Sequence, residues 1–190
     1  MMMTREKWLT EAVEMFVPLF ESVGAKVPEV RVSVGWPGGR GKKNGVIGQC
    51  WNKNASADKV AQIFISPVLD DAVRVLDVLA HELIHAIDEN QSGHRGAFRE
   101  MALAIGLEGK MTATVAGPSL RAELVSMASV LGAYPHAALN PSLSGIKKQG
   151  TRMLKVTCPE SGYIVRTTAK WLDMGTPSCP CHGEPMRLEV

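Results

Sequence analysis

Apolar residues recur at helical spacing in several segments of the chain, and this pattern predicts amphipathic helices. The segments are residues 4–23, 70–90, 98–105 and 119–131. Gly24 follows the first helix and Gly93 separates the second from the third, in keeping with the frequency of glycine at helix ends. The second helix carries the broadest apolar stripe, which consists of Val75, Leu76, Leu79, Leu83, Ile84 and Ile87.

Alternating or continuous apolar runs at residues 29–35, 46–51 and 61–65 predict three β-strands between the first two helices. The segment 35–45 is rich in Gly, Lys and Arg, and we expect a loop there. Strands and helices within one region predict an α+β domain over residues 1–133, with a short sheet packed on helices.

The composition changes after this domain. Residues 134–150 are rich in Pro, Ser and Gly and lack periodicity, which predicts a linker. Three strand candidates follow, MLKVT, YIVRTT and PMRLEV, and three cysteines lie between them. A small β module at residues 151–190 is too short to be stable on an apolar core alone, so a structural metal would suit it.

Composition narrows the function only slightly. Hydrophobic residues make up 45% and charged residues 21% of the chain, as in ordinary folded domains. The net charge of +2 is too small to argue nucleic-acid binding from charge alone. No signal peptide or bilayer-length apolar run is visible, so we expect a cytoplasmic protein without a membrane partner. In that reducing compartment, a cysteine group is more typical of a metal site than of disulfides.

The motif HELIH at residues 81–85 is the strongest chemical signal in the sequence. His81 and His85 are four residues apart on the second helix, so both rings leave from one face and can meet a single zinc ion. Glu82 lies one residue further round, where it would not bind the ion but could reach a water that does. Zinc hydrolases use this spacing, and Glu82 is therefore the candidate catalytic residue.

A third ligand has to come from beyond this helix. His94 is the best candidate, because it follows a Gly-containing turn that lets the chain double back. Asp88 and Glu89 are nearer in sequence and remain alternatives, although Asp88 could instead support His85 or be a surface charge. Three histidines leave one coordination position for water, as in catalytic rather than structural zinc sites.

Peptide hydrolysis is the usual chemistry of such a site. Zinc lowers the pKa of its bound water to about 7, and Glu82 accepts the proton and later passes it to the leaving amine. The simpler alternative is a chance match in a helix whose histidines are surface or core groups. The position of the motif in a correctly phased apolar helix, followed by His94, favours the zinc site.

The runs HELIHAID and GHRGAF, with GVIGQCWN and AQIFISPVLDDAVRVLDVLAHELIHA upstream, resemble the SprT-like metallopeptidases, which include the Spartan group of DNA–protein crosslink proteases. The resemblance covers about residues 30–105. It implies a small zincin-like fold, a single catalytic zinc and protein substrates that are often held on nucleic acid. The residues that match the family's ligands and catalytic acid are His81, His85, His94 and Glu82. The resemblance also points to VIGQCW as an edge strand that pairs with substrate.

The late cysteines look like two zinc-ribbon knuckles, CPESGY at 158–163 and CPCHG at 179–183. The first knuckle has Ser161 where a second cysteine is usual. The predicted ligands of a second, structural zinc are Cys158 and Cys179 with Cys181, His182 or both. The rival interpretation is a degenerate ribbon without metal, held by strand packing around Tyr163 and Trp171.

Basic residues outnumber acidic ones in and near the C-terminal module, which is compatible with phosphate-backbone contact, although a solvated face is the simpler reading. They are Lys147, Lys148, Arg152, Lys155, Arg166, Lys170 and Arg187, and a second basic loop holds Arg40, Lys42 and Lys43. DNA is therefore a candidate partner beside a protein substrate, while the sequence does not indicate the oligomeric state.

Two functions fit these features. The first is a zinc-dependent endopeptidase acting on intracellular proteins, with the C-terminal module as a targeting element. The alternative is a catalytically dormant, zinc-containing protein that associates with nucleic acid. Glu82 favours the first, because a purely structural site has no need for a carboxylate beside its open position.

Overall fold

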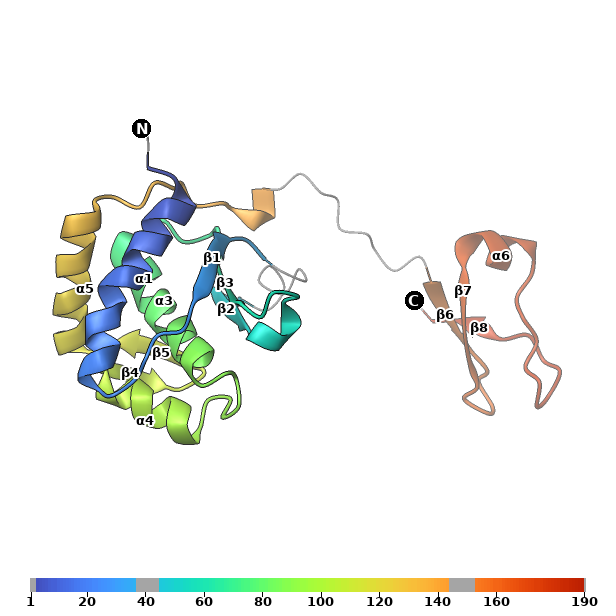
Figure 1. Ribbon diagram of the computed structural model, residues 1–190. Helices are drawn as coiled ribbons and strands as arrows, with labels where there is room; N and C mark the ends of the chain where they lie inside the picture. The colour runs from blue at the N-terminus through green and yellow to red at the C-terminus, as the bar shows by residue number, and fades with distance from the viewer. Residues whose placement is uncertain (1–2, 37–44, 144–152, 190) are drawn as a thin grey trace. The chain divides into compact units, whose positions relative to one another are not determined.

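The computed structural model describes residues 3–36, 45–143 and 153–189, and Figure 1 shows its elements. The chain forms two compact units, Met1–Ser144 and Gly145–Val190. In the first unit the elements are α1 (Arg5–Ser22), β1 (Val30–Val34), β2 (Gly48–Trp51), the 3-10 turn η2 (Lys53–Ala55), β3 (Ala61–Ile65), α3 (Ala72–Ile87), α4 (Gly96–Ala104), β4 (Leu107–Lys110), β5 (Ala113–Ala116), α5 (Pro118–Leu131) and the 3-10 turn η3 (Pro141–Leu143). This mixed architecture confirms the predicted α+β class.

The main sheet has three strands in the order β1-β3-β2. β1 runs parallel to β3, with Val32 opposite Ile63, and β2 runs antiparallel to β3, with Cys50 opposite Ile63. β2 therefore lies at one edge of this sheet, and it packs directly against α3. Between α4 and α5, β4 and β5 form an antiparallel hairpin that the sequence pattern did not predict.

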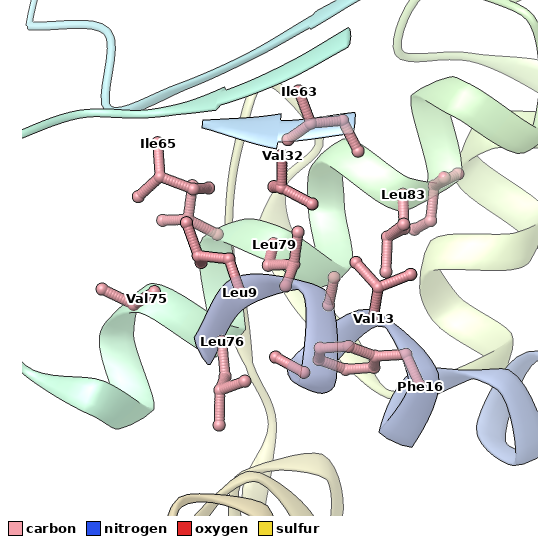
Figure 2. Close-up of a cluster of buried hydrophobic side chains, with 14 of the residues drawn as sticks. Leu9, Val13, Phe16, Val32, Ile63, Ile65, Val75, Leu76, Leu79 and Leu83 are labelled. Atoms are coloured by element: carbon pink, nitrogen blue, oxygen red, sulfur yellow. The ribbon is translucent and has the colours of Figure 1, made fainter. Parts of the chain in front are cut away.

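The core of the first unit lies between the sheet and two helices. Figure 2 shows the apolar side chains of α1 and α3 meeting those of β1 and β3. The fully or almost fully buried members are Leu9, Val13, Phe16, Val32, Ile63, Ile65, Val75, Leu76, Leu79 and Leu83. Because α3 is covered on several sides, three of its polar side chains are also buried, namely Asp77, Glu82 and His85.

The chain after α5 packs back onto the first unit. The rings of Trp8 and Tyr134 meet edge to face at a centroid distance of 4.9 Å, and the backbone N–H of Leu139 donates to the carbonyl of Pro67 at 2.7 Å. The predicted linker 134–150 therefore starts too early, since its first residues complete the core. Residues 144–152 lie outside the described part of the chain.

The second unit contains β6 (Met153–Thr157), β7 (Ile164–Thr168), the short helix α6 (Ala169–Met174) and β8 (Arg187–Leu188). Its antiparallel sheet has the order β7-β6-β8. The buried apolar cluster is small and consists of Val156, Cys158, Cys179 and Met186. Tyr163 and Trp171, around which the rival interpretation built its core, are 47% and 54% exposed. No helix in the described ranges is long and apolar enough to cross a bilayer.

Candidate functional site

A cleft of about 520 Å³ opens along α3, between β2 and residues 112–114 of the β4–β5 hairpin. His81, Glu82 and His85 all line it. Asp71 caps the start of α3, and its side chain accepts a hydrogen bond from the backbone N–H of Arg74 at 2.7 Å. Because the apolar stripe of α3 is fixed in the core, residues one turn apart on the opposite face are fixed along the cleft.

The turn after α3 brings His94 back to the cleft, where it also lines the wall. Asp88 braces this turn by accepting hydrogen bonds from the backbone N–H and the hydroxyl of Ser92 at 2.7 and 2.8 Å. Gly93 has a φ of 59°, which glycine adopts without strain. The predicted reversal at the SGH turn therefore has a local cause in the sequence.

The same turn is fastened to the edge strand. The side-chain amide of Asn90 donates to the carbonyl of Cys50 at 3.3 Å, and that of Asn52 donates to the carbonyl of Glu89. The Glu89 carboxylate pairs with Lys53. The alternative ligands Asp88 and Glu89 are thus engaged elsewhere, and neither belongs to the group of side chains that could hold a metal ion, which consists of His81, His85 and His94.

The three histidine rings converge on one point. The Nε2 atom of His94 lies 3.3 Å from Nε2 of His81 and 3.1 Å from Nε2 of His85. In a tetrahedral site with Zn–N distances of 2.0–2.1 Å, neighbouring ligand nitrogens are about 3.3–3.4 Å apart. The spacing of the rings therefore fits a zinc ion.

Burial keeps these imidazoles neutral. It lowers the pKa of His81 to about 3 and that of His85 to about 4, with a further contribution from the neighbouring rings. Burial also lowers the pKa of His94. A neutral imidazole is the form that binds a metal ion, so the electrostatics agree with the geometry.

Groups behind the ligands hold their orientation. The Nδ1 atom of His81 lies 2.8 Å from the hydroxyl oxygen of Thr114, so a proton on Nδ1 leaves Nε2 free to face the other rings. Phe98 packs against all three imidazoles at centroid distances of 4.4–5.0 Å. No local sequence pattern marks Thr114 as a site residue, because only tertiary packing brings the short strand β5 beside α3.

Glu82 is 6% exposed and lies directly under the edge strand. A Cβ atom on Gly48 would overlap Oε1 of Glu82 and would lie 2.5 Å from Cγ1 of Val78, so the close approach of β2 to α3 requires glycine. Burial raises the pKa of Glu82 to about 8, and a hydrogen bond with the backbone of Cys50 opposes this rise. The site thus holds a carboxyl group able to carry a proton near neutral pH.

The Cys50 side chain also lines the cleft. Burial and the nearby Glu82 raise the pKa of its thiol to about 12. The thiol therefore stays protonated at neutral pH, which makes Cys50 a small packing residue and not a nucleophile.

A second group of side chains that could bind a metal ion lies in the C-terminal unit. Cys158, Cys179 and His182 have ligand atoms within 4.8 Å of one another, with His182 Nδ1 at 3.9 and 3.8 Å from the two sulfur atoms. A zinc ion with bonds of about 2.3 Å to sulfur and 2.0–2.1 Å to nitrogen spaces these atoms by about 3.5 Å. Cys181 is exposed and is not part of this group, so of the predicted alternatives the structure brings together Cys158 and Cys179 with His182.

The two knuckles have the same backbone geometry. In the first, Cys158 N–H donates to Tyr163 and its carbonyl accepts from Gly162, at 2.9 and 3.0 Å. In the second, Cys179 N–H donates to Glu184 at 2.8 Å and its carbonyl accepts from Gly183 at 2.7 Å, so the sequence separations are the same. Ser161 therefore occupies the turn position that His182 occupies in the second knuckle, and its hydroxyl lies 3.3 Å from the Cys179 sulfur.

Hydrogen bonds support a metal-binding state of these thiols. The pKa of Cys179 is lowered to about 6, chiefly by the Ser161 hydroxyl, and the pKa of Cys158 is lowered by the same side chain and its backbone N–H. Thiolates are the zinc-binding form of cysteine, so Ser161 favours zinc binding by Cys158 and Cys179 although it is not itself a thiol. Of the predicted basic residues, Arg40, Lys42, Lys43, Lys147, Lys148 and Arg152 lie outside the described residues.

Comparisons of the chain with protein-family models, with curated proteins and with solved structures found no match.

Proposed function

We propose that this chain is a zinc-dependent endopeptidase of the SprT-like type, with His81, His85 and His94 as zinc ligands and Glu82 as the catalytic residue. The observation that carries the proposal is the convergence of three Nε2 atoms at 3.1 and 3.3 Å beside a buried carboxyl group in an open cleft. A surface or core role for three histidines would not require this convergence.

The division of labour follows from the position of each group. A bound zinc ion supplies Lewis acidity, which polarises a peptide carbonyl and lowers the pKa of water to about 7. Glu82 lines the same cleft and, as the carboxylate, takes the proton of the attacking water and then returns it to the leaving amine. Thr114 positions the His81 ring from behind.

The edge strand offers a way to hold an extended peptide. In the antiparallel pair, Ile47 accepts a hydrogen bond from Ser66, so the backbone groups of Gly48 and Cys50 face away from β3. The backbone groups of Cys50 are already hydrogen-bonded, to the Glu82 carboxyl group and to the Asn90 side-chain amide. Gly48 is therefore the residue that would pair with a substrate strand, and such pairing reads no side chain.

Nucleic acid is a candidate partner of the C-terminal unit. Tyr163 and Trp171 are about half exposed, and the ammonium group of Lys170 lies 4.9 Å from the Trp171 ring. Exposed aromatic rings beside cations suit the stacking of single-stranded bases. This feature also fits the alternative function, a dormant zinc protein on nucleic acid, and the cytoplasm remains the expected compartment for either.

Metal content tests both proposed zinc centres at once. The purified full-length chain should bind two zinc ions per molecule, measured by elemental analysis after removal of free metal. His94→Ala should lose one ion and Cys179→Ser the other, since each substitution leaves only two of the three grouped ligands, too few to hold a zinc ion. Cys181→Ser should keep both ions, because the exposed Cys181 is not one of the three grouped ligands, and loss of an ion in this variant would add Cys181 to the set.

A degradation assay tests the enzymatic function. The zinc-loaded chain should cleave an unfolded protein substrate, with and without single-stranded DNA, and a chelator should stop the cleavage until zinc is restored. Mass spectrometry of the products would give the cleaved bonds. A fully zinc-loaded chain that leaves every substrate intact, with or without DNA, would favour the dormant alternative.

A further inference from the structure

One cation stands at the end of the cleft that lies toward the start of α3. Arg74 lines the cleft two helical turns before His81, and its side chain is 35% exposed. The only carboxylates among the described lining residues are Asp77 and Glu82.

Asp77 holds Arg74 in this position from inside the protein. Its carboxylate pairs with the Arg74 guanidinium, but its side chain is only 8% exposed. The Oδ1 atom of Asp77 is buried without a hydrogen-bond partner among the described residues. The negative charge is thus enclosed, and the accessible part of the pair is the guanidinium.

The guanidinium has unused capacity. Arginine offers five N–H donors in a planar fork, and among the described residues the Arg74 side chain hydrogen-bonds only to Asp77, through Nη1. The carboxylate of Asp71, at the start of α3, is committed to the backbone N–H of Arg74. The remaining donors match a planar anion that can accept two parallel hydrogen bonds.

We propose that Arg74, held by Asp77, forms a substrate subsite that binds a carboxylate of the peptide. This inference rests on the proposed peptidase function and adds a preference that β-strand pairing alone cannot give. Residues 74 and 81 are separated by about 10 Å along the helix axis, which an extended peptide spans with about three residues. The carboxylate is therefore either an acidic side chain within about three residues of the cleaved bond or the C-terminus of a short peptide.

The test compares three peptides of otherwise identical sequence. One carries Glu near the cleaved bond and an amidated C-terminus, the second carries Gln there with the same amide, and the third carries Gln with a free C-terminal carboxylate. The zinc-loaded full chain should cleave one carboxylate peptide with a kcat/KM about tenfold or more above that of the neutral peptide. Which of the two is preferred identifies the source of the carboxylate.

The variants separate the guanidinium from general effects. Arg74→Gln with Asp77→Asn removes both charges without leaving a buried ion unpaired, and the preference should fall to about onefold. Arg31→Gln with Asp58→Asn is the matched control, since it removes an ion pair between β1 and the segment that joins η2 to β3, outside the cleft. Should the cleft double variant fail to fold, Arg74→Lys keeps the charge, and the preference should still drop several-fold because an ammonium lacks the planar fork.

Binding without turnover distinguishes the two proposals. Fluorescently labelled versions of the peptides are titrated with the zinc-loaded Glu82→Gln chain, and the carboxylate peptide should bind about tenfold more tightly, dependent on Arg74. Cleavage without a carboxylate preference, or a preference that survives in the cleft double variant, would overturn the subsite and leave the peptidase intact. Arg74-dependent binding by the Glu82→Gln chain, together with no cleavage of any peptide by the zinc-loaded parent chain, would uphold the subsite and overturn the peptidase.

Discussion

Glu82→Gln is expected to lower the rate of peptide cleavage by a factor of about 10³ while the zinc content stays at the parent value. General acid–base groups contribute about 10²–10⁴ to such reactions, and the amide can neither accept nor return the proton. Glutamine has nearly the same shape as the carboxylic acid and fits the same buried position under Gly48. The fold should therefore be unchanged.

The measurement is kcat/KM on a fixed peptide, combined with elemental analysis and a thermal unfolding curve. Glu100→Gln on the exposed side of α4 is the matched control and should behave like the parent. Cleavage at the parental rate by a zinc-loaded Glu82→Gln chain would remove Glu82 from the mechanism. Another carboxyl group would then have to be sought in the cleft, with Asp77 as the remaining one among its described lining residues.

Gly48→Ala is expected to be the most damaging single-methyl substitution near the site. Its new Cβ would overlap the Glu82 carboxylate and press on Val78, so either Glu82 or the edge strand must move. Displacing a catalytic group by about 1 Å can cost about 10²-fold in rate, and overpacking typically costs about 1–3 kcal/mol of stability. We expect both losses together.

Gly35→Ala is the matched control, because a Cβ there would meet only Phe64, at an ordinary contact distance of 4.0 Å. Both variants are compared with the parent by kcat/KM and by the midpoint of thermal unfolding. Parental activity and stability in Gly48→Ala would show that β2 lies further from α3 in solution, and strand pairing at Gly48 would lose its basis.

Most helices and strands of the first unit can be predicted from the sequence, because each of them buries one face and therefore carries a periodic apolar pattern. The apolar stripe of α3 and the alternation in β1 and β3 are local patterns, and the structure places their helix and strands within a few residues of the predicted bounds. The convergence of the histidines also has local causes. The spacing of His81 and His85 is set by the helix, and the turn that returns His94 contains Gly93.

Other features depend on contacts between distant segments, and no local pattern encodes them. The β4–β5 hairpin consists of two four-residue strands with a weak pattern, so nothing local marks Thr114 as the partner of His81. The Pro, Ser and Gly residues that follow Tyr134 predict a linker there, whereas the Tyr134 ring packs against Trp8. In the second unit, spacing alone could not decide between Cys181 and His182, which the turn geometry separates.

The fastening of the His94 turn to the edge strand has a mechanical consequence. Asn90 donates to the Cys50 carbonyl of β2, and Lys53 of the following turn η2 pairs with Glu89, so this part of the chain is joined at two points to the segment that carries His94. We expect a peptide paired with Gly48 to influence the position of the His94 ring, whereas the His81 and His85 rings are carried by α3. Peptide binding in the cleft and the affinity of the site for zinc would then be coupled.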